Sequence, residues 1–303
     1  MKLKTLSIFI SIGIILCACI IIIILYSNNK KAENQKEAEI KTIVVDDIEI
    51  AYQEYGQGYP LIMIMGYSGT MDMWSIELIE KLSSQYRVII FDNRGMGRST
   101  ASDKEFSIDL FTEDTAELMK ALDIDQANIL GWSMGTYMAQ NLSLKYPDKI
   151  NKLILYGADC GGDEAILPDE DTLAKLTNTS GTQEEQDEIL LSLLFPAEWL
   201  EANPDPSQYF PEITEQSSPA NIDRQTQAWL NWPGICNQID QIQNDTLVIT
   251  GTDDILTPPE NSRIILNKIP NASLLEINNA GHGLMYQYPD QLAEYLLVFL
   301  QNS

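Results

Sequence analysis

The residues best suited to chemistry are a serine, a histidine and an aspartate, each next to a glycine-containing stretch. Ser133 is the centre of Gly131–Gly135, which reads G-W-S-M-G. An apolar run precedes it and predicts a strand, and the following segment, 136–146, predicts a helix. In that context G-x-S-x-G indicates a nucleophile elbow, a tight turn that lifts the serine hydroxyl clear of the sheet. Glycine fits so crowded a backbone because it lacks Cβ.

A serine hydroxyl attacks a carbonyl only when a base takes its proton and a third group orients that base. The chain contains one histidine, His282, which follows the last predicted strand, so any imidazole chemistry must use it. Asp253 and Asp254 follow the predicted strand 246–250 and are the candidate acids. Because adjacent side chains point in different directions, only one of them can meet the imidazole. A Ser, Asp, His triad is the predicted constellation.

Acyl transfer also needs donors for the tetrahedral oxyanion, usually backbone N–H groups. One predicted donor is the amide of Met134, at the start of the helix behind the serine. The other is the amide of Tyr67, in the glycine-containing loop 66–69 after an apolar strand.

These residues require a sheet with helices between its strands. After a predicted hairpin over 41–55, strands and helices alternate, which predicts an α/β fold with a mostly parallel, doubly wound sheet. The active groups of such a sheet lie beyond the carboxyl ends of the strands. The predicted strands after the hairpin are 61–65, 87–91, the run before Ser133, 152–157, 246–250 and 272–277; the predicted helices are 72–83, 107–122, 136–146, 261–268 and 289–300.

The long segment between the predicted strands 152–157 and 246–250 exceeds a simple loop, so a helical cap is predicted over about 160–240, after the sixth strand. Its leucines and aromatic residues favour an uncharged or apolar substrate group. Cys160 and Cys236 bracket this cap. Two buried free thiols are the favoured expectation. A disulfide is the alternative if the domain is exported.

Composition excludes several classes of function. The net charge of −25 leaves no basic patch for nucleic acid, and a single histidine excludes metal sites built from several imidazoles. Without a C-x-x-C pair, a zinc ribbon and a thioredoxin-type site are also excluded. No cofactor or metal is expected.

The N-terminus predicts a membrane segment. The stretch from Leu6 to Tyr26 carries no charge and is long enough to cross a bilayer as a helix. An uncleaved signal-anchor over 1–26 is therefore expected, with a cleaved signal peptide or lipoprotein signal as the alternative. Residues 27–40 are predicted to form a polar tether. The lysines before the apolar run predict that the catalytic part lies outside the cytoplasm, as a membrane-anchored domain.

Residues 41–303 resemble α/β-hydrolase fold enzymes of the esterase, lipase and non-haem haloperoxidase type. The resemblance is carried by the elbow, the stretch Asp92–Ser99, the stretch Gly251–Pro258 and Ala280–His282. It implies that the acid is Asp254, three residues after the glycine. Where the family's oxyanion strand often ends in His-Gly, this chain has Met65-Gly66, which leaves the backbone donor intact. The stretch Asp92–Ser99 is expected to be structural, with Arg94 tying loops together.

The expected function is hydrolysis of a carboxylic ester of a small or apolar substrate through an acyl-enzyme on Ser133. One alternative is an aminopeptidase of the proline iminopeptidase type, since an acidic cap could attract the free amine of its substrate. Another is a non-catalytic ligand-binding relative, against which the intact triad argues. The expected partner is a small-molecule ester or amide, and the sequence leaves the oligomeric state open.

Overall fold

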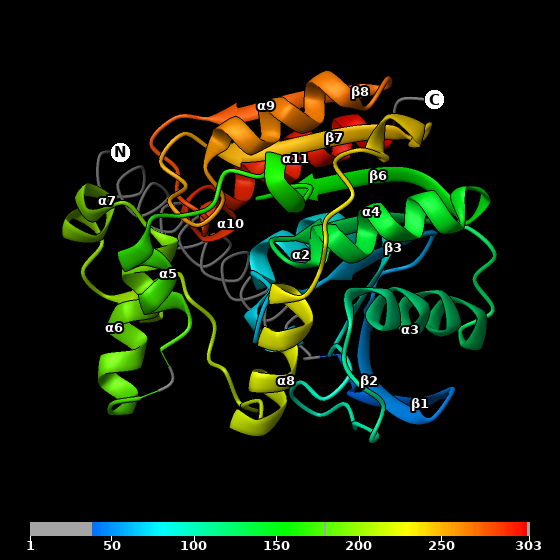
Figure 1. The fold of residues 1–303 in the computed structure, drawn as a ribbon, viewed down its shortest axis with the longest axis horizontal. Coiled ribbons are helices and arrows are strands. Elements are labelled where there is room, and N and C mark those ends of the chain that lie inside the picture. Colours follow the sequence, from blue (N-terminus) through cyan, green and yellow to red (C-terminus); the bar gives the residue numbers. More distant parts are fainter. Residues whose placement is uncertain (1–37, 179, 302–303) are drawn as a thin grey trace, which may run out of the picture. The chain divides into compact units, whose positions relative to one another are not determined.

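The computed structural model describes residues 38–178 and 180–301. They contain an eight-stranded sheet with the strand order β1-β2-β4-β3-β5-β6-β7-β8 (Figure 1). β1 pairs antiparallel with β2 and β2 antiparallel with β4, while the other neighbours are parallel. This confirms the α/β-hydrolase fold with a mostly parallel sheet. The strands are β1 (Lys41–Val45), β2 (Ile48–Tyr55), β3 (Tyr59–Ile64), β4 (Tyr86–Phe91), β5 (Ala127–Trp132), β6 (Ile150–Tyr156), β7 (Asp245–Gly251) and β8 (Ala272–Ile277).

The central strands are apolar because both of their faces are covered. Alternate side chains of a strand point to opposite faces. In β3, Ile62 and Ile64 enter one hydrophobic core and Leu61 and Met63 enter the other. A strand buried on both sides therefore needs a continuous apolar run.

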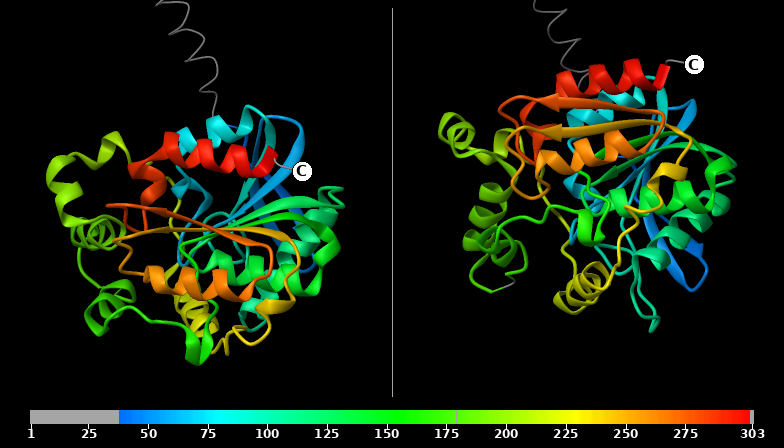
Figure 2. Two further views of the ribbon diagram at one scale, coloured as in Figure 1. Left: turned by 90° about the horizontal axis from the view of Figure 1, so that it is seen from above. Right: turned by 45° about the horizontal axis from the view of Figure 1, so that its top comes forward.

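Helices cover the two faces of the sheet separately. Figures 1 and 2 show α3, α4 and α9 on one face and α2 and α11 on the other. The core residues of α3 and α9 cluster together, whereas those of α2 and α11 belong to the second core. The helices of these two layers are α2 (Ile76–Ser83), α3 (Ile108–Ala121), α4 (Gly135–Lys145), α9 (Pro259–Lys268), α10 (Leu284–Gln287) and α11 (Pro289–Gln301).

A side-chain cap explains why one predicted helix is divided in two. The predicted helix 72–83 is divided into a short 3-10 helix, Met71–Met73, and α2. Ser75 separates them, because its side chain accepts a hydrogen bond from the Leu78 amide and so begins α2. Ser107 caps α3 in the same way. α10, which follows His282, was not predicted.

The segment between β6 and β7 carries α5 (Glu170–Leu176), α6 (Gln183–Leu194), α7 (Ala197–Ala202) and α8 (Pro219–Leu230). In Figure 1, α5, α6 and α7 are grouped beyond the carboxyl ends of β6 to β8. α8 is fastened to the loop after β4. Its Asn221 donates to the Gly95 carbonyl (2.9 Å), and its Arg224 donates to the carbonyls of Ser102 (2.7 Å) and Lys104 (2.6 Å).

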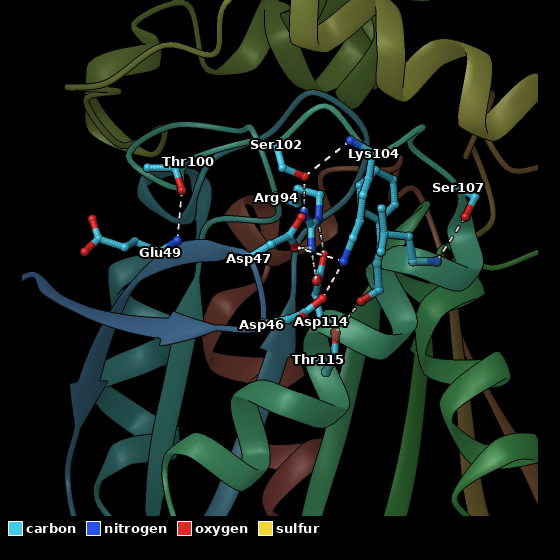
Figure 3. Close-up of polar contacts among 12 residues, drawn as sticks. Asp46, Asp47, Glu49, Arg94, Thr100, Ser102, Lys104, Ser107, Asp114 and Thr115 are labelled. Atoms are coloured by element: carbon cyan, nitrogen blue, oxygen red, sulfur yellow. Dashed lines mark hydrogen bonds and ion pairs between the residues drawn. The ribbon is translucent and has the colours of Figure 1, made fainter.

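Arg94 joins three parts of the chain, as Figure 3 shows. Its guanidinium, which is fully buried, forms a two-point ion pair with Asp114 of α3 and donates to Asp47 in the β1–β2 turn and to Ser102. A hydrogen bond from Ser102, together with hydrogen bonds from Arg94 and Lys104, holds the pKa of the Asp47 carboxyl well below its usual range. The residue therefore ties loops together, as expected from the sequence.

A disulfide joins Cys160 and Cys236, so the expectation of two free thiols was wrong. Cys160 lies four residues after the end of β6, and the chain returns from α8 to the same place. The two segments touch so closely that a Cβ on Gly234 would lie 2.2 Å from the Gly161 carbonyl carbon. The Ile235 amide also donates to the Cys160 carbonyl (2.8 Å). Glycine makes this contact possible, and the contact brings the two sulfurs together.

The predicted membrane segment and tether, apart from residues 38–40, lie outside the described residues. Among the helices of 38–178 and 180–301, none has the length and apolar character needed to cross a membrane.

Candidate active site

Ser133 occupies the turn between β5 and α4. Its φ of 56° lies in the left-handed region, which is unusual for a residue with a side chain. Its amide donates to the Tyr156 carbonyl (2.8 Å), and its carbonyl accepts from the Thr136 amide (2.8 Å). These bonds hold the backbone in a conformation that would otherwise be strained. The side chain stays partly exposed.

The glycines on either side of Ser133 are required by close backbone contacts. A Cβ on Gly131 would lie 2.5 Å from the Gly135 carbonyl oxygen, and one on Gly135 would lie 2.2 Å from the Ile64 carbonyl oxygen. A Cβ does not fit at such short distances from a backbone oxygen. This is the steric reason expected for the two glycines of the G-x-S-x-G pattern.

His282 and Asp254 form a buried pair. Nδ1 of His282 lies 2.8 Å from Oδ2 of Asp254, and the residues are 2% and 3% exposed. Thr257 donates its hydroxyl to Oδ2 of Asp254 (2.8 Å), and the amides of Leu256 and Thr257 donate to Oδ1 (3.0 and 2.9 Å). Because the carboxylate can only accept, Nδ1 carries the proton and Nε2 is left as the basic nitrogen.

The structure distinguishes the two candidate acids. Asp253 is exposed, and its amide is used in a hydrogen bond to the Ala280 carbonyl (2.9 Å). Asp254, the next residue, is turned inward to His282. The sequence motif did not predict Thr257, which completes the set of donors around the carboxylate.

The backbone of His282 is held by aromatic residues. Its carbonyl accepts hydrogen bonds from the Tyr156 hydroxyl (2.5 Å) and the Trp132 indole (3.3 Å). The Trp132 and His282 rings lie 5.5 Å apart, and Gly157 leaves room for the imidazole, since a Cβ there would be 2.8 Å from Cε1. These contacts come from the ends of β5 and β6, far from His282 in the chain, so no local pattern predicted them.

The loop after β3 lies against the elbow. A Cβ on Gly66 would lie 2.9 Å from the Ser133 Cβ. Among the described residues, neither the Tyr67 amide nor the Met134 amide donates to a protein acceptor. Both amides are therefore free to donate to a substrate oxygen.

α8 supports this loop from the other side. The Ser68 amide donates to Oε1 of Gln225 (2.7 Å), and the Tyr67 hydroxyl lies 2.7 Å from the Thr226 hydroxyl. Ser68 has a φ of 55°, and Gln225 is fully buried. The conformation of the loop thus depends on a helix that lies more than 150 residues away in the chain.

A cavity of about 380 Å³ joins these groups. Ser133, His282, Tyr67 and Met134 all line it, so it brings the predicted nucleophile, base and oxyanion donors to one space. No hydrogen bond joins Ser133 Oγ to His282 within the described chain, and in unliganded enzymes this bond is often long. Most of the lining is apolar, with contributions from Met65, Met73, Leu190, Leu193, Ile222 and Trp229.

A buried carboxylate in the cavity wall was missed by the sequence analysis. Asp159 lies in the loop after β6, is 8% exposed and accepts from the Tyr137 hydroxyl (2.7 Å) and the Gly161 amide (2.7 Å). Burial raises the pKa of this carboxyl, while these two hydrogen bonds and the charge of protonated His282 act in the opposite direction. No motif surrounds Asp159, so nothing in the sequence marked it.

No metal-binding cluster of three or more His, Cys, Asp or Glu side chains occurs in 38–178 or 180–301. The groups present in the described site can perform proton transfer, nucleophilic attack and oxyanion binding.

Residues 59–289 match the family described as alpha/beta hydrolase fold. A protein of Caulobacter sp. (strain K31), provisionally named carbamate hydrolase RutD, is 30% identical over 247 residues, which cover 80% of this chain and 91% of that protein. A Mycobacterium tuberculosis protein (strain H37Rv), provisionally named non-heme bromoperoxidase BpoC, is 27% identical over 275 residues, which cover 84% of this chain and 98% of that protein. The solved structure of an alpha/beta hydrolase fold protein from Chitinophaga pinensis has a TM-score of 0.76 and 27% identity, covering 88% of this chain and 98% of that one.

Proposed function

Because the chain belongs to the alpha/beta hydrolase fold family, we propose that it is a serine hydrolase that cleaves a carboxylic ester through an acyl-enzyme on Ser133. The observation that carries this proposal is the buried hydrogen bond between Asp254 and His282, beside a cavity that Ser133 also lines. An oriented base next to an elbow serine is the arrangement that activates a hydroxyl nucleophile.

In the proposed mechanism, Nε2 of His282 takes the hydroxyl proton of Ser133 while Oγ attacks the ester carbonyl. The amides of Tyr67 and Met134 donate to the oxyanion, and Asp254 stabilises the imidazolium. His282 then gives its proton to the leaving alcohol as the C–O bond breaks. Water, deprotonated by His282, attacks the acyl-enzyme and releases the acid and the free serine.

A second candidate is an aminopeptidase that cleaves an amide next to a free amine. The feature that favours it is the acidic character of the cavity, to which Asp159, Asp187 and Glu215 contribute carboxylates. The nucleophile, base and oxyanion donors would be the same in both reactions.

We also propose that the hydrolase part lies outside the cytoplasm, anchored by the apolar segment Leu6–Tyr26. The Cys160–Cys236 disulfide supports this location, because disulfides persist mainly in oxidising compartments.

The test is labelling of the full-length chain with a fluorophosphonate, which reacts covalently with an activated serine. We expect labelling of the wild type, its loss in Ser133→Ala and His282→Ala, and its retention in Ser192→Ala, where an exposed serine is removed. A folded wild type that does not label would refute the catalytic role and leave a ligand-binding role. Hydrolysis of aryl esters and proline arylamides by unlabelled wild-type protein distinguishes the two enzyme candidates.

A further inference from the structure

Asp159 stands out among the charged groups that line the cavity. In the described part of the chain, the other charged side chains of the lining are Lys175, Asp187 and Glu215, all exposed, and the titratable base His282. Lys175 is paired with Asp171 (2.7 Å). The proposed mechanism gives Asp159 no part, although burying a carboxylate costs free energy unless it is paired.

Asp159 lines the cavity, and its hydrogen bonds leave acceptor capacity on both carboxylate oxygens. Oδ2 accepts from the Tyr137 hydroxyl and Oδ1 from the Gly161 amide, so each oxygen has one further lone-pair direction. The Tyr137 ring stacks on Trp232 with 4.2 Å between centroids, which fixes the donor and hence the carboxylate. Asp159 is therefore a rigid acceptor rather than a mobile surface charge.

Asp159 also lies close to the reacting groups. Tyr137 is four residues after Ser133, in the first turns of α4. Gly157, two residues before Asp159, lies against the His282 imidazole. The loop that carries Asp159 thus lies beside the segments that hold the serine and the histidine.

We propose that Asp159 is a specificity-determining residue that selects substrates with a positively charged ammonium group close to the scissile bond. The inference rests on the proposed function and names its substrate class. An ammonium group would give Asp159 the charge-assisted partner that residues 38–178 and 180–301 do not provide, and a substrate carboxylate there would meet a like charge. The exposed acidic residues Asp187 and Glu215 act in the same direction at longer range.

The test compares esters of equal size and different charge. On the alcohol side, 2-(dimethylamino)ethyl acetate is the cationic analogue of 3-methylbutyl acetate, and 3-acetoxypropanoate carries an anion. On the acyl side, ethyl N,N-dimethylglycinate is matched with ethyl 3-methylbutanoate. Acid release in a pH-stat gives kcat/KM for each, with wild type, Asp159→Asn and Asp163→Asn. Asp163 is an exposed control that does not line the cavity.

Asp159→Asn keeps an acceptor for the Gly161 amide, and its new N–H can donate to the Tyr137 oxygen. In Asp159→Asn we expect the cationic-to-neutral ratio of kcat/KM to fall by about fivefold or more in at least one ester pair, and the relative rate for the anionic ester to rise. Asp163→Asn keeps the wild-type ratio. Using ratios cancels the intrinsic reactivity of each ester. A smaller change in both pairs overturns the inference, as does an equal change in Asp163→Asn.

Calorimetry separates this inference from the proposed function. Ser133→Ala protein is titrated with 2-(dimethylamino)ethyl acetate and 3-methylbutyl acetate, with and without Asp159→Asn. We expect a loss of about fivefold or more in affinity for the cationic ester alone. Binding without that loss refutes the role of Asp159. If the wild type hydrolyses no ester, the proposed function fails, while the calorimetry still decides the inference.

Discussion

Reduction of the Cys160–Cys236 disulfide should lower the free energy of unfolding by several kcal/mol. The cross-link joins residues 76 positions apart. In the chain-entropy model, a loop of that length removes about 15 cal/mol/K from the unfolded state, or about 4.5 kcal/mol at 25 °C. Single domains are stable by roughly 5–15 kcal/mol, so the loss is a large part of the total.

Guanidinium unfolding curves, followed by tryptophan fluorescence, measure this difference between oxidised and reduced wild type. Reduction breaks the cross-link and leaves both cysteine side chains in place. A Cys160→Ala/Cys236→Ala variant also removes side-chain volume, so any further loss of unfolding free energy in the variant measures that effect. The dependence of the unfolding free energy on denaturant should increase on reduction, because the unfolded chain then exposes more surface. A difference below about 1 kcal/mol would refute the reasoning, since the cross-link would then barely restrict the unfolded chain.

Three further outcomes are expected. Asp254→Asn should lower kcat for ester hydrolysis by roughly 10³–10⁴-fold, because the imidazole loses its orienting carboxylate. The control Asp253→Asn should keep a kcat near that of the wild type. Equal losses of kcat in the two variants would contradict the assignment of the acid. Gln225→Met should lower kcat about tenfold with little change in KM, because it removes the acceptor that holds the oxyanion loop, residues 66–69. The same measurement on Gln227→Met, which changes an exposed glutamine, is the control. Asp92→Asn should gain stability relative to wild type as the pH rises. Burial raises the pKa of Asp92 from 3.8 to about 6, so the native state keeps a proton that the unfolded state releases near pH 4. The stability this group contributes is present below pH 4 and lost as the pH rises through 6, about 3 kcal/mol in all. Chemical denaturation of both proteins from pH 3.5 to 7.5 measures it, and a difference independent of pH contradicts it.

The elbow and the alternating strands could be predicted because their causes are local. G-x-S-x-G needs glycines within two residues of the serine, and the buried strands need continuous apolar runs. The choice between Asp253 and Asp254 could not be made from the residue types. It depends on the Asp253 amide pairing with Ala280, which belongs to a loop after the next strand.

Non-local contacts account for what the sequence did not predict. The disulfide requires that the segment after α8 return to the end of β6, and nothing in the spacing of Cys160 and Cys236 shows that return. Asp159 is a functional candidate only because the loop after β6 forms a wall of the cavity. A single aspartate without a motif carries no such information.

In the proposed mechanism, the same non-local contacts link specificity to catalysis. The oxyanion loop is held by Gln225 and Thr226 of α8, which belongs to the insertion rather than to the sheet. The disulfide closes the base of that insertion, and Asp159 lies next to Cys160. In the proposed mechanism, a change in the insertion would affect the carboxylate of Asp159 and the Tyr67 oxyanion donor together. Reduced protein that remains folded should lose kcat as well as the selectivity for cationic esters, whereas loss of selectivity alone would mean that α8 keeps its place without the cross-link.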